Sequence, residues 1–302
     1  MILNRDNIEL AFKGFKSVYT DAYNQTPVFH QDFAMEVNSS AASETYGWLG
    51  QFPMLREWVG DRVVRQLAAQ SFTITNRKFE STVEISREDF ADDRYGLFKP
   101  VFAEMGHLAR QHPDQIIFAL LATGFTTQCY DGQYFFDTDH PVPHKTAPET
   151  GDPDSHSNFT DGAGPAWFLF DTSRTIKPFI WQVREKYEFE SLTDSRDAHV
   201  FITDKYLYGV RARVNAGYGL WQLAHASKTD LTPDTYAAAR RKMMGIRGDR
   251  GRLLGVMPDL LVVPPELETE ARKLLNSENA DAGASNPWKG TAKLIVCPYL
   301  EA

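Results

Sequence analysis

A helical repeat of apolar positions lies between Pro100 and Gly124. The apolar residues recur every three to four positions, as on one face of an amphipathic helix: Phe102, Met105, Ala109, Ile116 and Leu120. With Pro100 in the first turn and Gly124 at the C-terminal stop, the helix would measure about 37 Å. Pro113 leaves two interpretations open, because an interior proline costs about 3 kcal/mol. We favour one long kinked helix; the alternative is two helices broken at His112–Pro113.

Strict alternation of residue types predicts one long strand from Tyr206 to Tyr218. Tyrosine, valine and alanine take one face, and the other face carries the polar residues. At about 3.3 Å per residue the strand would measure about 43 Å, more than twice the usual length. Arg211 and Arg213 lie two apart on the polar face, where we expect them to pair with acids of a neighbouring strand or subunit. A long helix beside a long strand predicts an elongated body.

The N-terminal quarter of the chain predicts an arm followed by a hairpin. Residues 1–42 are mixed in character and end in a polar run, which favours an arm over a compact unit. Residues 61–67 and 72–79 each alternate and are separated by a short polar segment, which is typical of a long hairpin. Its polar face is rich in basic residues, so we expect the hairpin to project from the body.

The last 75 residues predict a small α/β lobe. Thr232 and Pro233 form an N-cap and first helical position, and Gly245 ends that helix. Residues 260–263 form a short buried strand, a second helix opens at Pro265, and residues 293–300 form another strand. The prolines at 264 and 265 remove backbone donors where this strand meets its helix, which disfavours a phosphate site there.

Composition narrows the class of protein. A chain of 302 residues with 42% hydrophobic content can bury a large core. Its net charge of −8 disfavours a basic groove for nucleic acid. The apolar runs are far shorter than a membrane span, and the N-terminus does not read as a secretory signal. Cys129 and Cys297 occur in unrelated contexts, so we expect two buried free thiols.

The best metal-ligand candidate is the segment 131–141, which holds Asp131, Asp137, Asp139 and His140. Oxygen and nitrogen ligands could gather a divalent cation, but the spacing fits neither an EF-hand nor a zinc pattern. The dipeptides Asp-Gly and His-Pro are typical of turns, so we interpret the segment as a structural turn. No motif for catalysis or nucleotide binding is present. We therefore assign no catalytic, cofactor-binding or metal residue and no cofactor.

Several stretches taken together resemble the major head (capsid) proteins of Mu-like phages and prophages, the gpT family. They cover nearly the whole chain: Val37–Ser40, Thr45–Gly50, Glu57–Gly60, Ile85–Phe90, Cys129–Gln133, Phe135–Asp137, His140–Val142, Leu169–Arg174, Tyr208–Arg211, Trp221–Ala224 and Leu260–Pro264. Each stretch alone is weak, and the set is specific.

The resemblance implies an α+β fold, the tailed-phage major capsid fold of the Hong Kong 97 type. On that basis we expect an N-terminal arm at 1–42 and an extended hairpin loop at 43–88. A peripheral domain would follow at 89–227, with a spine helix at about 100–124 and long strands at about 167–224, and an axial domain at 228–302. In the more usual order the axial domain precedes the long strand, whereas here the strand comes first.

The same resemblance implies a structural role and no enzymatic activity. The subunits would assemble into pentamers and hexamers of an icosahedral head that encloses double-stranded DNA, with weak or non-specific contact to that DNA. Other expected partners are a scaffolding protein during assembly, the portal and decoration proteins, with no membrane contact. The protein would reside in the capsid of the virion after assembly in the host cytoplasm. Two alternatives stay open: another phage structural subunit, such as a decoration or tail protein, or a soluble enzyme with an unrecognised site.

Overall fold

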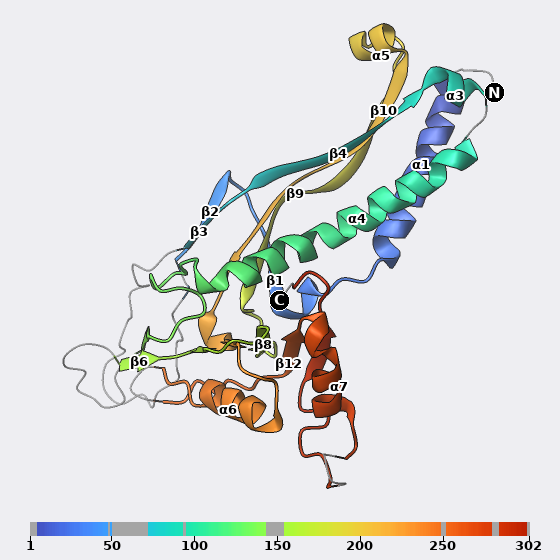
Figure 1. The fold of residues 1–302 in the computed structure, drawn as a ribbon. Coiled ribbons are helices and arrows are strands. Elements are labelled where there is room, and N and C mark those ends of the chain that lie inside the picture. The colour runs from blue at the N-terminus through green and yellow to red at the C-terminus, as the bar shows by residue number, and fades with distance from the viewer. Residues whose placement is uncertain are drawn as a thin grey trace.

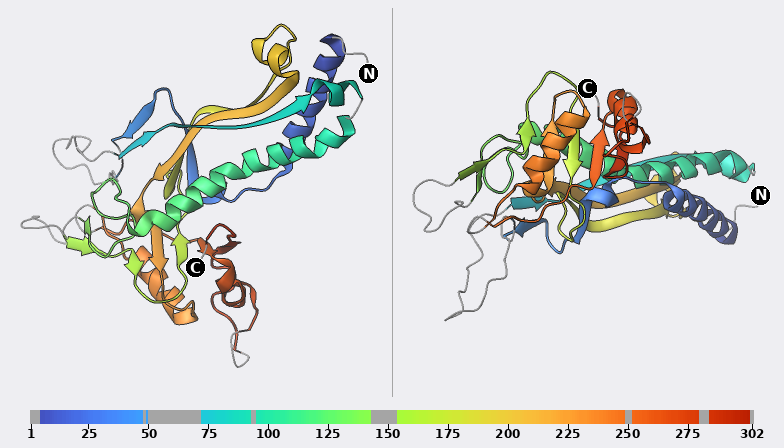
Figure 2. Two further views of the ribbon diagram at one scale, coloured as in Figure 1. Left: turned by 45° about the horizontal axis from the view of Figure 1, so that its top comes forward. Right: turned by 90° about the horizontal axis from the view of Figure 1, so that it is seen from below.

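The computed structural model describes residues 5–47, 49, 72–92, 95–142, 154–248, 252–279 and 284–300. The molecule is elongated, with a long sheet and the two longest helices at one end and a smaller lobe at the other (Figures 1 and 2). The buried apolar residues form two clusters. One lies in the lobe and the adjoining ends of the long elements, and the other lies between the long sheet and its helices. Among the described helices, none is long and apolar enough to cross a membrane.

A four-stranded sheet runs along the body in the order β1-β9-β10-β4. Its strands are β1 (Ala34–Asn38), β4 (Arg77–Ser86), β9 (Phe179–Leu192) and β10 (Lys205–Tyr218). β1 pairs with β9 in parallel, and the other pairs are antiparallel. The predicted long strand is confirmed as β10, in which alternate residues from Tyr206 to Val214 are buried. Its other face pairs Arg211 and Arg213 with Glu185 of β9, at 2.7 and 3.0 Å, as expected from the alternation.

The predicted spine is a single helix, α4 (Tyr95–Ala122), and the two-helix alternative is wrong. It begins five residues before Pro100, so that proline lies inside the helix and not at its start. Pro113 is also interior and is buried. Packing against α1 (Arg5–Gln25) on one side and β10 on another offsets the backbone hydrogen bond that Pro113 removes. After α4 the chain turns through η1 (Thr123–Phe125), close to the predicted stop at Gly124.

The segment predicted as an arm packs on the body of its own subunit. α1 lies along α4, where the Phe15 and Phe102 rings stack 4.3 Å apart, and Tyr19 is buried beside them. A short helix, α2 (His30–Phe33), then leads into β1 at the edge of the long sheet. The reason is visible in the sequence of α1, whose aromatic residues form an apolar face that needs a partner.

Only the second strand of the predicted hairpin lies within the described residues. β3 (Phe72–Thr75) pairs with β2 (Ser43–Tyr46), and residues 61–67 lie outside the described residues. The predicted strand 72–79 is divided at Asn76 between β3 and β4. The amide of Asn76 donates to Ser39 and Ala41 and accepts from Gln182, and these contacts between distant segments break the alternation there.

The lobe has a five-stranded sheet whose strands come from both sides of residue 228. The order is β13-β12-β8-β11-β7, and the strands are β7 (Phe159–Thr160), β8 (Trp167–Phe170), β11 (Ala224–Ser227), β12 (Leu260–Val263) and β13 (Lys293–Val296). Three of these strands precede residue 228. β8 is buried along its whole length because it lies between β12 and β11, so the C-terminal segment cannot form this core alone.

The remaining elements complete the lobe and the connections. α6 (Pro233–Met244) has the predicted Thr232 cap and Pro233 start. The helix predicted to open at Pro265 begins as a single 3₁₀ turn, η4 (Pro265–Leu267), and continues as α7 (Glu268–Asn276). The last strand ends at Val296, before the predicted position 300. The other elements are α3 (Arg87–Ala91), α5 (Ala198–Thr203), η2 (Trp221–Leu223), β5 (His140–Val142) and β6 (Asp154–His156).

Candidate functional site

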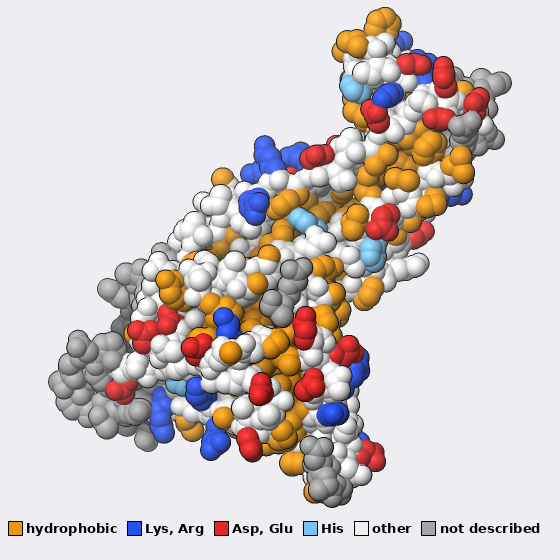
Figure 3. All heavy atoms as spheres, in the orientation of Figure 1, with side chains coloured by type: hydrophobic (Ala, Val, Ile, Leu, Met, Phe, Trp, Pro, Cys, Tyr) orange, Lys and Arg blue, Asp and Glu red, His pale blue; other side chains and the backbone are white. Residues whose placement is uncertain are grey.

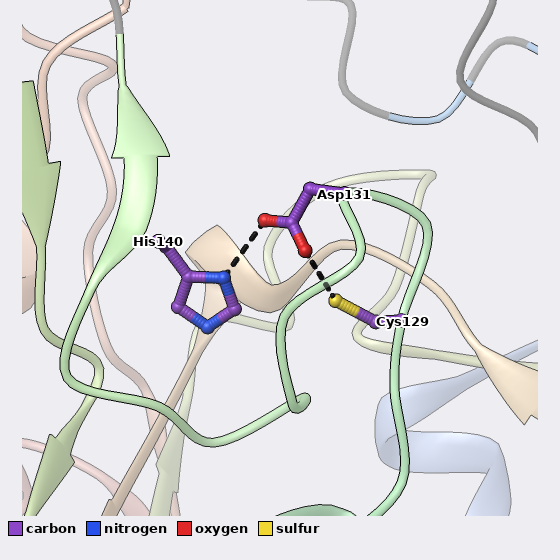
Figure 4. A group of neighbouring side chains, drawn as sticks. All are labelled: Cys129, Asp131 and His140. Atoms are coloured by element: carbon purple, nitrogen blue, oxygen red, sulfur yellow. Dashed lines mark hydrogen bonds and ion pairs between the residues drawn. The ribbon is translucent and has the colours of Figure 1, made fainter. Parts of the chain in front are cut away.

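The strongest cluster of reactive side chains lies in the turn between η1 and β5, around Asp131 (Figure 4). The Cys129 thiol donates to Asp131 Oδ1 at 3.0 Å, and His140 Nδ1 lies 2.8 Å from Asp131 Oδ2. The local sequence shapes this turn. Gly132 supplies a positive φ of 88°, which a residue with a Cβ would rarely adopt, and the backbone N–H of Gln133 donates to Asp131 Oδ1.

Burial and hydrogen bonding set the protonation states in this cluster. The Asp131 side chain is 3% exposed, and burial by itself raises the pKa of its carboxyl. The hydrogen bonds from His140 and Cys129 outweigh that effect, so the pKa of Asp131 lies below its usual value. Burial, together with the neighbouring carboxylate, raises the pKa of the Cys129 thiol far above its usual range. Cys129 is therefore a protonated donor and not a thiolate nucleophile.

The structure brings together only some of the candidate metal ligands in residues 131–141. Asp131 and His140 meet, whereas Asp137 accepts from the backbone of Tyr134 and Thr138 instead. The cluster also includes Cys129, which the sequence predicts only as a buried thiol. Among the described residues, Cys129, Asp131 and His140 are the group whose ligand-type atoms converge, within 4.8 Å of one another. Cys129 Sγ and His140 Nδ1 already form hydrogen bonds with the Asp131 carboxylate, while His140 Nε2 is buried without a hydrogen-bond partner among the described residues.

The cluster fixes the turn to the core of the molecule. The imidazole of His140 stacks on the Trp221 indole, with ring centroids 4.0 Å apart and planes 11° from parallel. Since His140 is held by Asp131 on its edge and by Trp221 on its face, the turn is joined to η2, a segment some eighty residues away. This arrangement supports the interpretation of residues 131–141 as a structural turn.

We expect Asp131→Asn to destabilise the unassembled subunit by about 1.5–3 kcal/mol, the range for buried hydrogen bonds to a charged group. The amide cannot accept from both Cys129 and His140 as the carboxylate does. Urea unfolding of unassembled subunits measures the change. Asp161→Asn is the matched control, because Asp161 is exposed and, among the described residues, accepts only from Gly162, its neighbour in the chain. Equal unfolding free energies for the two variants would contradict this role for Asp131.

A second buried histidine also has a structural environment. His225 in β11 lies 3.1 Å from the Thr160 hydroxyl of β7, and Lys242 of α6 donates to the same hydroxyl at 3.0 Å. Burial, with the nearby Lys242 charge, lowers the pKa of His225 to about 3, so the ring is neutral near pH 7. These contacts join strand, strand and helix within the lobe.

The fold and these sites define a class of protein. The reactive side chains described above stabilise turns and strand junctions, and the molecule is an elongated α+β tile with a long sheet, a helix along it and a separate lobe (Figure 1). This architecture is that of a tailed-phage capsid subunit of the Hong Kong 97 type.

Solved shells of bacteriophage JBD30 have the same fold. A chain of its procapsid superposes with a TM-score of 0.88 at 42% identity, covering 99% of this chain and 100% of that one. A chain of the JBD30 capsid gives a TM-score of 0.77 at 30% identity, covering 94% of each chain. A further solved structure is the JBD30 capsid decorated with minor capsid protein trimers, with a TM-score of 0.76.

Curated relatives agree over nearly the full length. The major capsid protein of Escherichia phage Mu is 42% identical over 306 residues, covering 99% of this chain and all of that protein. The FluMu prophage major head subunit of Haemophilus influenzae is 41% identical over 304 residues, covering 98% of each. The family model of the Mu-like prophage major head subunit gpT matches residues 8–300. The chain belongs to this family: it is a major capsid protein, and it resides in the phage head.

Proposed function

We propose that copies of this chain form pentamers and hexamers and close into an icosahedral head around double-stranded DNA. The observation that carries the proposal is the near full-length match to chains of a procapsid and a capsid. The physical basis is multivalency, because each tile contacts several neighbours and many modest contacts sum to a stable shell.

Each part of the chain receives a role in this proposal. Residues 1–42 serve as the arm, although α1 and β1 pack on the body of their own subunit, and residues 43–88 serve as the extended loop, which joins the long sheet through β4. Residues 89–227 form the peripheral domain around α4, β9 and β10, and β1 and β4 from residues 1–88 complete its sheet. Residues 228–302 form the axial domain, together with β7, β8 and β11, whose pairing with β12 supports this enlarged boundary.

The partners follow from the same role. We assign a scaffolding protein during assembly, a portal at one vertex and a decoration protein on the finished shell. The decorated JBD30 capsid supports the last of these by analogy. The net charge of −8 suits a wall that encloses DNA with weak contact. We assign no catalytic activity, in keeping with the structural role of the family as major head subunits.

Negative-stain microscopy of the expressed protein, alone and with its scaffolding protein, tests the proposal. We expect closed shells, and purified empty shells should retain little double-stranded DNA even at low salt. Rings or tubes would favour a decoration or tail subunit. A small oligomer stabilised by a ligand would favour an enzyme. Persistent monomers under both conditions, or tight sequence-independent DNA binding, would contradict the proposal.

A further inference from the structure

The imidazole of His140 has one nitrogen that its neighbours do not use. The side chain is fully buried, and Nδ1 lies 2.8 Å from Asp131 Oδ2. In the neutral ring the Nδ1 proton donates to that carboxylate, which leaves the lone pair on Nε2. Among the described residues, the buried Nε2 has no hydrogen-bond partner. Histidines that bind metal ions have this arrangement, in which a carboxylate holds one nitrogen and the other faces the ion.

A second imidazole lies directly opposite His140. β5 and β6 are antiparallel, and their register pairs His140 with His156. Residues in such a pair have Cβ atoms about 4.5–5.5 Å apart on one face of the ribbon. The Trp221 indole stacks with both rings, at centroid distances of 4.0 Å from His140 and 6.0 Å from His156. The two imidazole planes are 11° and 24° from parallel with the indole, so lone pairs in those planes can converge on one ion.

The histidine pair is open to solvent on one side. His156 is half-buried, whereas His140 is fully buried. Figure 3 shows histidine atoms (pale blue, lower left) at the surface of the lobe, near the position of β6 in Figure 1. Water can therefore complete the coordination of an ion held by two imidazoles, as it does in metal sites that keep an open position.

Cys129 and Asp131 lie beside the histidine pair and are already engaged with each other. The Cys129 thiol and the backbone N–H of Gln133 donate to Asp131 Oδ1, and His140 Nδ1 donates to Oδ2. An ion bound to Cys129 Sγ and Asp131 would have to displace these protons, whereas an ion at His140 Nε2 displaces none. The ligands are therefore imidazoles, which suit Zn²⁺, Ni²⁺ and Cu²⁺ better than they suit Ca²⁺ or Mg²⁺.

We propose that the β5–β6 ribbon binds a divalent transition-metal ion of the Zn²⁺ class, with His140 Nε2 and the imidazole of His156 as its protein ligands. Asp131 is a positioning residue, which holds the His140 ring through Nδ1. Because the two ligands lie on separate strands, the bound ion joins β5 to β6, and its binding free energy stabilises the folded subunit.

Equilibrium dialysis of the chelator-treated, unassembled subunit against Zn²⁺ tests the site. The wild type should bind a single ion, and its melting temperature should rise as Zn²⁺ is added. His156→Ala should lose both effects and still fold, because this half-buried side chain lies outside the Asp131–His140 pair. His199→Ala is the matched control. His199 is also half-buried with an Nε2 that lacks a hydrogen-bond partner among the described residues, but it lies on α5 at the other end of the molecule, so Zn²⁺ binding should be unchanged.

Two further measurements distinguish the ligands from their neighbours. Asp131→Asn should weaken Zn²⁺ binding by about tenfold, the lower end of the usual effect of removing a group that orients a ligating histidine, because the amide oxygen can still accept from Nδ1. With Co²⁺ as the probe, the absorption spectrum should lack a sulfur-to-metal charge-transfer band. A wild type that does not bind Zn²⁺, unchanged binding by His156→Ala, or a sulfur-to-cobalt band would overturn the inference. These measurements use the unassembled subunit, so their outcome is separate from that of the shell experiment.

Discussion

Replacing Gly106 by valine should destabilise the unassembled subunit by about 3 kcal/mol, the upper part of the range for overpacking a tight contact. Gly106 lies where α1 crosses α4. A Cβ at this position would meet the Tyr19 carbonyl oxygen at 2.3 Å, and the Tyr19 carbonyl carbon and Tyr23 nitrogen at 3.1 Å. These are backbone atoms of a neighbouring helix, so they move only if α1 shifts as a whole. Urea unfolding measures the loss of stability, and hydrogen exchange of α1 amides measures its separation from α4.

Gly14→Val is the matched control, because Gly14 also lies inside a long helix and a Cβ there meets nothing within 4 Å. Valine is slightly better than glycine in a helix interior, so this variant should be neutral or a few tenths of a kcal/mol more stable. The free energy of unfolding of Gly106→Ala should lie between those of Gly106→Val and Gly14→Val. If Gly106→Val changed the free energy of unfolding no more than Gly14→Val does, the packing of α1 on α4 would not depend on this close approach.

The elements predicted well from sequence are those whose pattern is long. Burial in β10 alternates from Tyr206 to Val214, and the repeat in α4 stays in phase across Pro113, so each pattern outweighs local exceptions. The strand pairing of the lobe is harder to predict from sequence. β8 consists of four apolar residues, and such a short run does not indicate which sheet the strand joins. Its pairing with β12 spans some ninety residues. Only tertiary contact decides such a pairing, and the same holds for the break at Asn76.

The candidate sites show the same limit. Asp131 and His140 lie nine residues apart in a segment of turn residues, so their meeting could be anticipated, and the Cys129–Asp131 spacing is the signal that was missed. Phe201 and Ile202 of α5 are the most exposed large apolar side chains among the described residues, and periodicity could not predict this, because six residues are too few to define a helical face. Their exposure depends on how β9 and β10 position the connection between them.

A buried carboxylate ties the N-terminal segment to the spine. Asp114 of α4 is 1% exposed and accepts from the backbone N–H groups of Phe29 and His30, at 3.0 and 2.8 Å. His30 Nδ1 lies 2.7 Å from the same carboxylate. One side chain therefore satisfies the donors at the start of α2, which leads directly into β1 of the long sheet. No other described carboxylate accepts from this turn, so its loss cannot be compensated locally.

Asp114→Asn should destabilise the unassembled subunit by about 3 kcal/mol, the upper part of the range for leaving a buried donor without its acceptor. The amide directs an NH₂ group toward donors and leaves at least one of them without an acceptor in the core. Asp32→Asn is the matched control two residues beyond His30. Its carboxylate pairs with Lys293 at 2.6 Å, but the two side chains are 33% and 62% exposed, and such surface pairs contribute under about 1 kcal/mol. Chemical unfolding of both variants gives the comparison. An Asp114→Asn effect no larger than that of Asp32→Asn would mean that α2 is held by the aromatic packing of Phe33 and not by this carboxylate.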